Sequence, residues 1–391
     1  MQRTFVLINN TGLGGAERRF GRLFARMADE DPGTTLAVNA SLWLKLVEAG
    51  VVSGLEDRIW QLPEPFGRVT SWAGMHQDGP GFWLRKLDYG LFGVLLLVRC
   101  ALARRRMLHL VLGGAYVGLP LMLLRPDHRT VISVVHYLPL LAGSTCALQF
   151  YRFALSRCHG IDALSEGVRA DLLQRGLSGD RMFVSNGSVV DTVRFQPALQ
   201  KAPWVVFSGR LVEEKNPLLF IEAVPAVLQL VPEAKFYMLG EGPLAPRVEQ
   251  ALDRLKLRDA VTVGFRPDPA PVLSKARVFV SLQRTDNYPS QALLEAMACG
   301  MAVVATDVGQ TCKLVDETVG RRVKADAASV AAAVVRLLRE PGRASKMGQR
   351  GRERVMRHHS TEAYLEYLEG VYESVGWGRS GSAQKRFSEQ R

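Results

Sequence analysis

Short apolar runs alternate with longer amphipathic runs along the first half of the chain, and this alternation limits the folds that the chain can adopt. The run Arg3–Asn9 predicts a strand, and the glycines of Gly12–Gly15 predict a turn before an amphipathic helix at Ala16–Asp29. Strands that alternate with helices at this spacing form a parallel, doubly wound sheet. Further strands of this kind are predicted at Leu36–Ala40, Met107–Leu112, Thr130–His136, Asp162–Leu164 and Met182–Val184.

The same pattern restarts after residue 203, with strands predicted at Trp204–Ser208, Lys235–Leu239 and Val278–Leu282, so two α/β domains are predicted. The segment Phe195–Pro203 carries two prolines and little apolar periodicity, as expected of a linker. A chain of 391 residues is also too long for one ordinary core. We expect an N-terminal Rossmann-like domain over residues 1–197, a C-terminal Rossmann-like domain over 198–360, a helix over 361–375 that crosses back to the N-terminal domain, and a polar tail over 376–391.

The composition is that of a globular protein, with 47% hydrophobic and 23% charged residues. The formal net charge of +12 favours anionic partners, namely nucleic acid, an anionic membrane surface or phosphorylated substrates, although a solvated basic surface also accounts for it. No recognised nucleic-acid module accompanies the charge, so nucleic acid is not expected as a partner. The five cysteines form no CxxC pair, which indicates reduced thiols in the cytoplasm rather than a disulfide framework or a zinc site.

Two apolar segments bear on whether the protein meets a membrane. Residues 107–124 lack Asp, Glu, Lys and Arg, but three glycines and Pro120 interrupt them, so a buried strand and a short helix are predicted rather than a membrane span. Residues 91–106 are apolar and then abruptly basic. This pattern suits a helix on an anionic bilayer surface, and it also suits a core helix with a basic last turn. We therefore expect the protein to be cytoplasmic, in peripheral contact with the inner face of the membrane.

The run Ser281–Gly309 places a carboxylate where a nucleotide could be held. Glu295 lies on an apolar helix that ends at Gly300 and precedes a strand, Met301–Ala305. Open α/β sheets bind ligands at the carboxyl ends of their strands, and a carboxylate there can accept hydrogen bonds from ribose hydroxyls. The sequence thus predicts ribose binding by Glu295.

A pair of cations, Arg210 and Lys215, follows a predicted strand and precedes a helix that begins at Pro217. A planar guanidinium and a compact ammonium suit a diphosphate, although an ordinary exposed loop has the same residue types. Two glycine turns and His136 are weaker candidates. The Gly12–Gly15 turn and the Gly240–Gly242 turn could approach a phosphate or could be plain turns, and the first lacks the GxGxxG spacing of a dinucleotide site.

Four strings together resemble the GT-B glycosyltransferases of family 4, over roughly residues 4 to 375. They are GGAER from Gly14, GRLVEEKNP from Gly209, GEGP from Gly240 and LLEAMACG from Leu293. The resemblance implies the GT-B fold, in which two Rossmann-like domains face each other across a cleft. It also implies that Arg210 and Lys215 grip the leaving diphosphate and that Glu295 binds ribose. His136, at a predicted strand end, would position donor and acceptor or serve only the structure.

One position departs from the family pattern, in which two glutamates are separated by seven residues. Glu295 matches the second glutamate, but Asn287 stands at the first, and Asp286 is one residue further away. Either Asp286 supplies the carboxylate beside the transferred sugar or Asn287 replaces its charge with an amide, which puts the catalytic rate in doubt. The catalytic candidates are Arg210, Lys215, His136, Asp286 and Asn287, and the predicted nucleotide-sugar-binding residues are Gly14, Gly15, Gly209, Gly240, Gly242, Tyr288, Pro289, Ser290, Gln291, Leu294 and Glu295.

The resemblance predicts a retaining glycosyltransferase that moves a sugar from a UDP- or GDP-linked donor to a hydroxyl group. No metal is expected, because Arg210 and Lys215 would neutralise the diphosphate. A glycan or lipid-linked acceptor in cell-surface polysaccharide or glycolipid assembly is expected from the basic charge and the 91–106 segment. Three alternatives stay open: a nucleotide-sugar epimerase, a catalytically weak or inactive glycosyltransferase-like subunit, and an NAD-dependent dehydrogenase suggested only by the first glycine turn.

Overall fold

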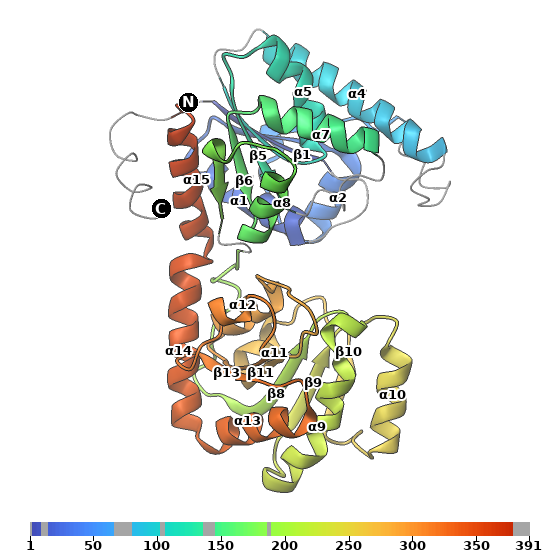
Figure 1. Ribbon diagram of the computed structural model, residues 1–391, viewed down its shortest axis with the longest axis vertical. Coiled ribbons are helices and arrows are strands. Elements are labelled where there is room, and N and C mark those ends of the chain that lie inside the picture. Colours follow the sequence, from blue (N-terminus) through green and yellow to red (C-terminus); the bar gives the residue numbers. More distant parts are fainter. Residues whose placement is uncertain are drawn as a thin grey trace. The chain divides into compact units, whose positions relative to one another are not determined.

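The computed structural model describes residues 2–8, 15–65, 80–101, 106–135, 145–185 and 189–377. The chain divides into two compact units, each with its own parallel sheet and flanking helices (Figure 1). The first unit comprises Met1–Ser185 and Leu365–Arg391, and the second comprises Asn186–Tyr364. None of the described helices combines the length and the apolar character needed to cross a bilayer.

The first unit is built on seven parallel strands in the order β3-β2-β1-β4-β5-β6-β7. Its strands are almost wholly buried, because helices cover both faces of the sheet. The elements are β1 (Arg3–Ile8), α1 (Gly15–Glu30), β2 (Thr34–Asn39), α2 (Ala40–Glu48), β3 (Ile59–Leu62), α4 (Pro80–Ala101), β4 (Met107–Leu112), α5 (Gly114–Leu124), β5 (Arg129–Val134), α7 (Thr145–Arg157), β6 (Gly160–Ala163), α8 (Glu166–Gln174), β7 (Met182–Val184) and α15 (Thr361–Ser374).

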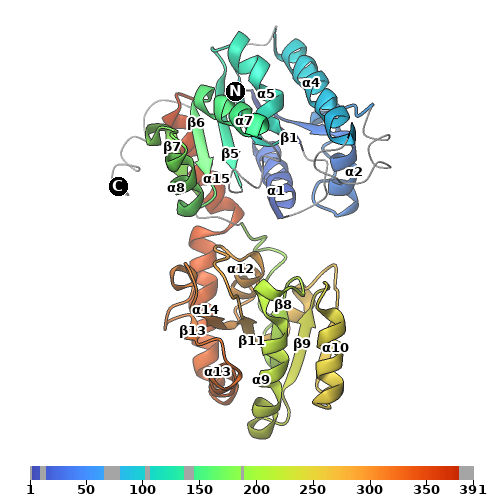
Figure 2. The ribbon, with the colours of Figure 1, turned by 45° about the vertical axis from the view of Figure 1, so that its right-hand side comes forward.

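Helices α4, α5 and α7 lie side by side over one face of this sheet (Figures 1 and 2). Their inward side chains, among them Phe92, Val117 and Tyr151, share one apolar core with the strands. Helix α5 lies unusually close to β1, since a Cβ atom on Gly114 would overlap the Val6 carbonyl oxygen. Residues 107–124 thus form a buried strand and a short helix, as predicted.

A chain of buried hydrogen bonds joins α15 to the first sheet. The Tyr372 hydroxyl lies 2.6 Å from Nδ1 of His109, and Nε2 of His109 lies 2.7 Å from the Ser133 hydroxyl. Ser133 donates to Oδ2 of Asp162 at 2.5 Å, and Tyr367 donates to Oδ1 of Asp162 at 2.9 Å. Because the single hydroxyl proton of Ser133 is donated to Asp162, Ser133 must accept from Nε2–H of His109. The remaining ring nitrogen, Nδ1, then accepts from Tyr372. The donor and the acceptor of each of these hydrogen bonds are thereby assigned.

The second unit is built on six parallel strands in the order β10-β9-β8-β11-β12-β13. As in the first unit, the first three strands in sequence form one half of the sheet, and the later strands form the other half. The elements are β8 (Ala202–Ser208), α9 (Pro217–Leu230), β9 (Lys235–Leu239), α10 (Ala245–Arg254), β10 (Val261–Gly264), α11 (Ala270–Lys275), β11 (Ala276–Ser281), α12 (Gln291–Ala298), β12 (Ala302–Thr306), β13 (Gly320–Val323), α13 (Ala327–Arg339) and α14 (Pro341–His358).

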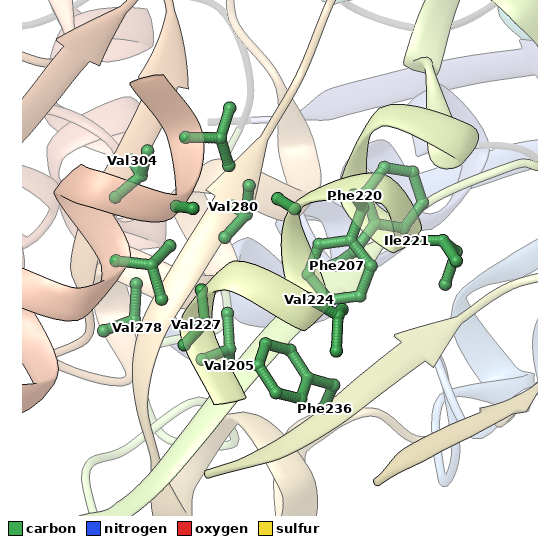
Figure 3. Packing of buried hydrophobic residues seen from close by; sticks show 14 of the residues in the cluster. Val205, Phe207, Phe220, Ile221, Val224, Val227, Phe236, Val278, Val280 and Val304 are labelled. Carbon is green, nitrogen blue, oxygen red and sulfur yellow. The ribbon is translucent and has the colours of Figure 1, made fainter. Parts of the chain in front are cut away.

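Two apolar layers hold the second sheet between its helices. Figure 3 shows one layer, in which Phe207 on β8, Phe220 on α9 and Phe236 on β9 pack together beside the valines of β11 and β12. The opposite layer packs α11, α12 and α14 on the same strands. The predicted strands Trp204–Ser208, Lys235–Leu239 and Val278–Leu282 correspond to β8, β9 and β11, with boundaries shifted by at most two residues.

The structure differs from the sequence prediction at three places. Helix α2 and strand β3 were not predicted. Helix α2 follows β2 directly with no turn residues between them, and Ile59–Leu62 is only four residues long. The segment 195–203, predicted as a linker, packs on the second unit instead. Phe195 is buried in its core, and the Ala198 N–H donates to the Ser274 carbonyl oxygen at 3.0 Å.

Candidate functional site

The second sheet has its topological switch point between β8 and β11. From β8 the chain first builds outward through β9 and β10, and it then returns to place β11 on the other side of β8. Loops that leave neighbouring strands in opposite directions open a crevice at the carboxyl ends of those strands, where open α/β sheets bind ligands. The loops that border this crevice are residues 209–216 after β8 and residues 282–290 after β11.

Two glycine turns are locked together beside the crevice. The Gly209 N–H donates to the Leu239 carbonyl oxygen at 3.0 Å, and the Leu211 N–H donates to the Glu241 carbonyl oxygen at 2.9 Å. A Cβ atom on Gly240 would overlap the Gly209 carbonyl oxygen, and one on Gly242 would lie 2.6 Å from the Leu211 carbonyl oxygen. Packing alone therefore requires glycine at both positions of the Gly240–Gly242 turn. The two glycines are thus explained by a structural turn, with or without a ligand contact.

The two cations of the first loop are available for a ligand. Arg210 is exposed and Lys215 is half-buried, and neither side chain forms a hydrogen bond or an ion pair within the described part of the chain. Burial lowers the pKa of the Lys215 ammonium, and the neighbouring Glu214 carboxylate partly offsets that effect. A cation held away from water without a partner is a strong attractor for an anion.

Arg284, which was not among the predicted site residues, connects the two loops of the crevice. It leaves β11 and donates its backbone N–H to the Glu214 carbonyl oxygen at 2.9 Å. Its guanidinium donates to Oδ1 of Asn216 at 3.2 Å and pairs with Glu213 at 3.3 Å. The one available signal in the sequence was a cation three residues beyond a strand end, which is too common to identify a site.

The loop after β11 contains both candidates for the first carboxylate position, Asp286 and Asn287. Oδ1 of Asp286 accepts from the Gln310 backbone N–H at 3.1 Å, and Oδ2 accepts from the Gln310 side-chain amide at 3.1 Å. Asp286 is thus committed to the loop after β12. Asn287, by contrast, is exposed, and its side chain has no hydrogen-bond partner among the residues that the structure describes. Asn287 is therefore the more available of the two.

Helix α12 carries the remaining predicted residues of this loop. Glu295 is half-buried on its second turn and accepts from the Gln291 side-chain amide at 3.1 Å. Ser290 stands before the helix, but its side chain does not cap the first turn. Tyr288 is half-buried, and its ring lies 5.5 Å from the Lys313 ammonium. The prediction that Leu294 contacts a ligand fits poorly, because its side chain is fully buried in the core between α12 and the sheet.

The sites predicted in the first unit lie mostly beyond the described part of the chain. Gly14 and His136 are outside the described residues, and Gly15 is the first residue of α1. In the described part of the first unit, β1 ends at Ile8 and β5 ends at Val134. Both strands end at the carboxyl edge of the first sheet, which has its own switch point between β1 and β4.

The family of glycosyl transferases group 1 matches residues 202–340, the segment that runs from β8 to the end of α13. This match covers the crevice loops and both cations. The second unit contains a group 1 glycosyltransferase domain. The predicted family is thereby confirmed for this segment.

Curated relatives match part of the chain. One component of the phosphatidylinositol N-acetylglucosaminyltransferase of Arabidopsis thaliana is 32% identical over 145 residues, which are 35% of this chain and 32% of that protein. The alpha-maltose-1-phosphate synthase of Mycolicibacterium smegmatis is 29% identical over 258 residues, which are 57% of this chain and 65% of that protein. The chain thus spans about one third to two thirds of the length of these relatives.

Solved structures extend the likeness to nearly the whole chain. The Anabaena HepE protein, crystallised in complex with UDP and glucose, aligns with a TM-score of 0.69 at 15% sequence identity, covering 96% of this chain and 100% of that one. At this identity the likeness concerns the fold, and it confirms the predicted fold class: GT-B, with two parallel α/β sheets.

Proposed function

We propose that the protein is a retaining glycosyltransferase that moves a sugar from a nucleoside-diphosphate sugar to a hydroxyl group. The observation that carries the proposal is the crevice between β8 and β11, which holds two cations without a partner in the described chain at a sheet's switch point. Two helices, α9 and α12, begin directly after the loops that border it. Helix N-termini favour phosphate groups, so charge and backbone dipoles support the same anion.

Arg210 and Lys215 would bind the donor diphosphate and neutralise the charge that builds up as it leaves. No metal ion is needed in this account, because the two side chains supply the positive charge. The acceptor oxygen attacks the anomeric carbon on the face that the diphosphate leaves. The bond from that carbon to the phosphate oxygen breaks, the acceptor proton passes to the departing phosphate, and the products are a glycoside and a nucleoside diphosphate.

Other residues of the crevice would position the donor. Glu295 would accept hydrogen bonds from the ribose hydroxyls, and Gly209 would allow the backbone to approach the phosphates. The backbone of residues 288–291 would face the sugar. Asn287 would support the anomeric carbon through its amide, since Asp286 is engaged by Gln310. His136, Gly14 and Gly15 would contribute from the first unit.

The proposed donor is a UDP-sugar, with a GDP-sugar as the second choice. HepE, which shares the fold, was crystallised in complex with UDP and glucose. The proposed acceptor is a glycan or a lipid-linked glycan in polysaccharide or glycolipid assembly. The first curated relative above is named for transfer to phosphatidylinositol, which supports a lipid-linked acceptor. The proposed location is the cytoplasm, in peripheral contact with the inner membrane face.

The test is release of nucleoside diphosphate by the purified protein from UDP- and GDP-sugars in turn, with and without a membrane lipid extract and with and without EDTA. We expect release from one donor, stimulation by the extract and no effect of EDTA. Conversion of the donor sugar without an acceptor would indicate an epimerase instead. Tight nucleotide binding without release under any condition would refute turnover and leave a protein that only binds.

A further inference from the structure

Helix α4 carries a second apolar stripe, on the side that faces away from its core. Phe92, Leu96 and Cys100 are buried between α4 and the sheet. Leu87, Val94 and Val98 are 55%, 55% and 67% exposed, and Leu95 is exposed as well. The spacing of seven and then four residues puts these side chains on one helical face, about 16 Å long at 1.5 Å per residue. A water-facing helix surface normally carries charged residues in these positions.

The apolar surface continues on the two neighbouring helices. Leu123 and Leu124 are exposed at the end of α5, and Phe150 and Phe153 are exposed on α7. Helices α4, α5 and α7 pack in that order (Figure 2), and Tyr116 of α5 stacks on Phe150 of α7 with ring centroids 5.5 Å apart. We call the exposed apolar residues of these three helices the α4–α5–α7 face. Exposed apolar side chains gathered on adjacent helices indicate an interaction site.

The stretch of sequence that carries this face is strongly basic. Residues 80–160 contain ten Lys and Arg residues but only two Asp and no Glu, in a chain with a net charge of +12. Of the two carboxylates, one is buried and the other is paired with an arginine. Asp88 is fully buried, and Asp127 accepts from the Arg125 guanidinium at 2.9 and 2.8 Å. Exposed arginines flank the apolar residues, namely Arg99 on α4 and Arg157 on α7.

We propose that the α4–α5–α7 face docks on an anionic lipid bilayer, with α4 lying in the plane of the interface. The apolar stripe would enter the boundary between headgroups and acyl chains, and the arginines would meet the lipid phosphates. A second copy of this chain would bring the same excess of basic residues to the contact, so the charge favours an anionic lipid surface over self-association. The inference identifies the surface behind the membrane contact in the proposed function, but it does not depend on catalysis.

The test is flotation with vesicles of phosphatidylglycerol and phosphatidylcholine in equal parts, without donor or acceptor. We expect the wild type to bind, and its binding to fall steeply as NaCl is raised. The variant Val94→Glu/Val98→Glu should bind about tenfold more weakly or worse, because two charges enter the buried side of the contact. Leu124→Glu on α5 is an independent variant and should weaken binding in the same direction.

The matched control is Leu44→Glu/Val47→Glu, which introduces the same two charges at exposed apolar positions of α2 in the same unit. It should bind as the wild type does. Equal loss in both double variants, or binding to phosphatidylcholine alone that equals binding to the anionic vesicles, would overturn the proposal. So would a wild type that ignores vesicles but self-associates in sedimentation through residues 94 and 98. Nucleoside-diphosphate release is measured separately, so failure of either proposal is recognised independently.

Discussion

The buried hydrogen bonds between α15 and the first sheet make a sharp prediction for Tyr372→Phe. This change removes one hydroxyl and keeps the ring, which is fully buried and lies 5.1 Å from the Arg3 guanidinium carbon. Nδ1 of His109 then loses its donor at a position that water does not reach, since His109 is fully buried. The ring cannot recover by protonation, because burial, with Arg3 and Arg19 nearby, lowers the pKa of His109 to about 3.

The expected loss follows from those contacts. A neutral hydrogen bond contributes about 1 kcal/mol, and an acceptor left buried without a partner costs about 1–3 kcal/mol. We therefore expect Tyr372→Phe to lower the free energy of unfolding of the first unit by about 2 kcal/mol. The control is Tyr151→Phe on α7, whose ring is equally buried but whose hydroxyl has no hydrogen-bond partner among the described residues. That change should cost less than about 0.5 kcal/mol.

Urea unfolding followed by tryptophan fluorescence can isolate the first unit. Of the six tryptophans, only Trp204 belongs to the second unit, so a Trp204→Phe background leaves fluorescence from the first unit alone. The midpoint should fall in Tyr372→Phe with an unchanged dependence on urea. A loss no larger than that of Tyr151→Phe would refute the importance of this contact for docking α15.

Three further predictions concern pH, backbone packing and catalysis. The pKa of His109 is lower in the folded protein (about 3) than in the unfolded chain (about 6.5), so stability is lost as pH falls below 6.5. Urea unfolding at pH 7 and at pH 5 measures this effect. Between the two pH values, the free energy of unfolding should fall by about 2 kcal/mol more in the wild type than in His109→Gln. Gly240→Ala should lower the free energy of unfolding by about 2 kcal/mol and weaken UDP binding, because its methyl group overlaps the Gly209 carbonyl oxygen. The control is Gly342→Ala at the start of α14, where the methyl group meets open space. It should change the free energy of unfolding by less than about 1 kcal/mol in the same titrations. Asn287→Glu should raise kcat of sugar transfer by about tenfold or more, and an unchanged kcat would place residue 287 away from the reacting carbon.

The two parallel sheets could be predicted because their strands are buried on both faces and therefore appear as continuous apolar runs. Strands β8, β9 and β11 were found in this way. Strand β3 was missed because four residues, Ile59–Leu62, with Gln61 facing solvent, do not form such a run. The partner of His109 was also beyond prediction, since Tyr372 is 263 residues away in sequence. Only the fold brings the two side chains together.

The candidate site was predictable where one short segment carried the signal, and not where two segments meet. Arg210 and Lys215 share one loop, and the sequence placed both at a strand end. The role of Arg284 depends on its contacts with Glu213 and Asn216, which belong to the other loop. The choice between Asp286 and Asn287 depended on Gln310, 24 residues from Asp286, whose backbone and side chain hold that carboxylate.

The central claim is that the crevice between β8 and β11 binds the donor diphosphate through Arg210 and Lys215. The direct measurement is calorimetric titration of UDP into the wild type, Arg210→Ala and Lys215→Ala, with Arg254→Ala as the control because Arg254 is an exposed arginine at the end of α10. The account predicts affinity at least about tenfold weaker in each crevice variant and unchanged affinity in the control. Equal UDP affinity in all four proteins would contradict it.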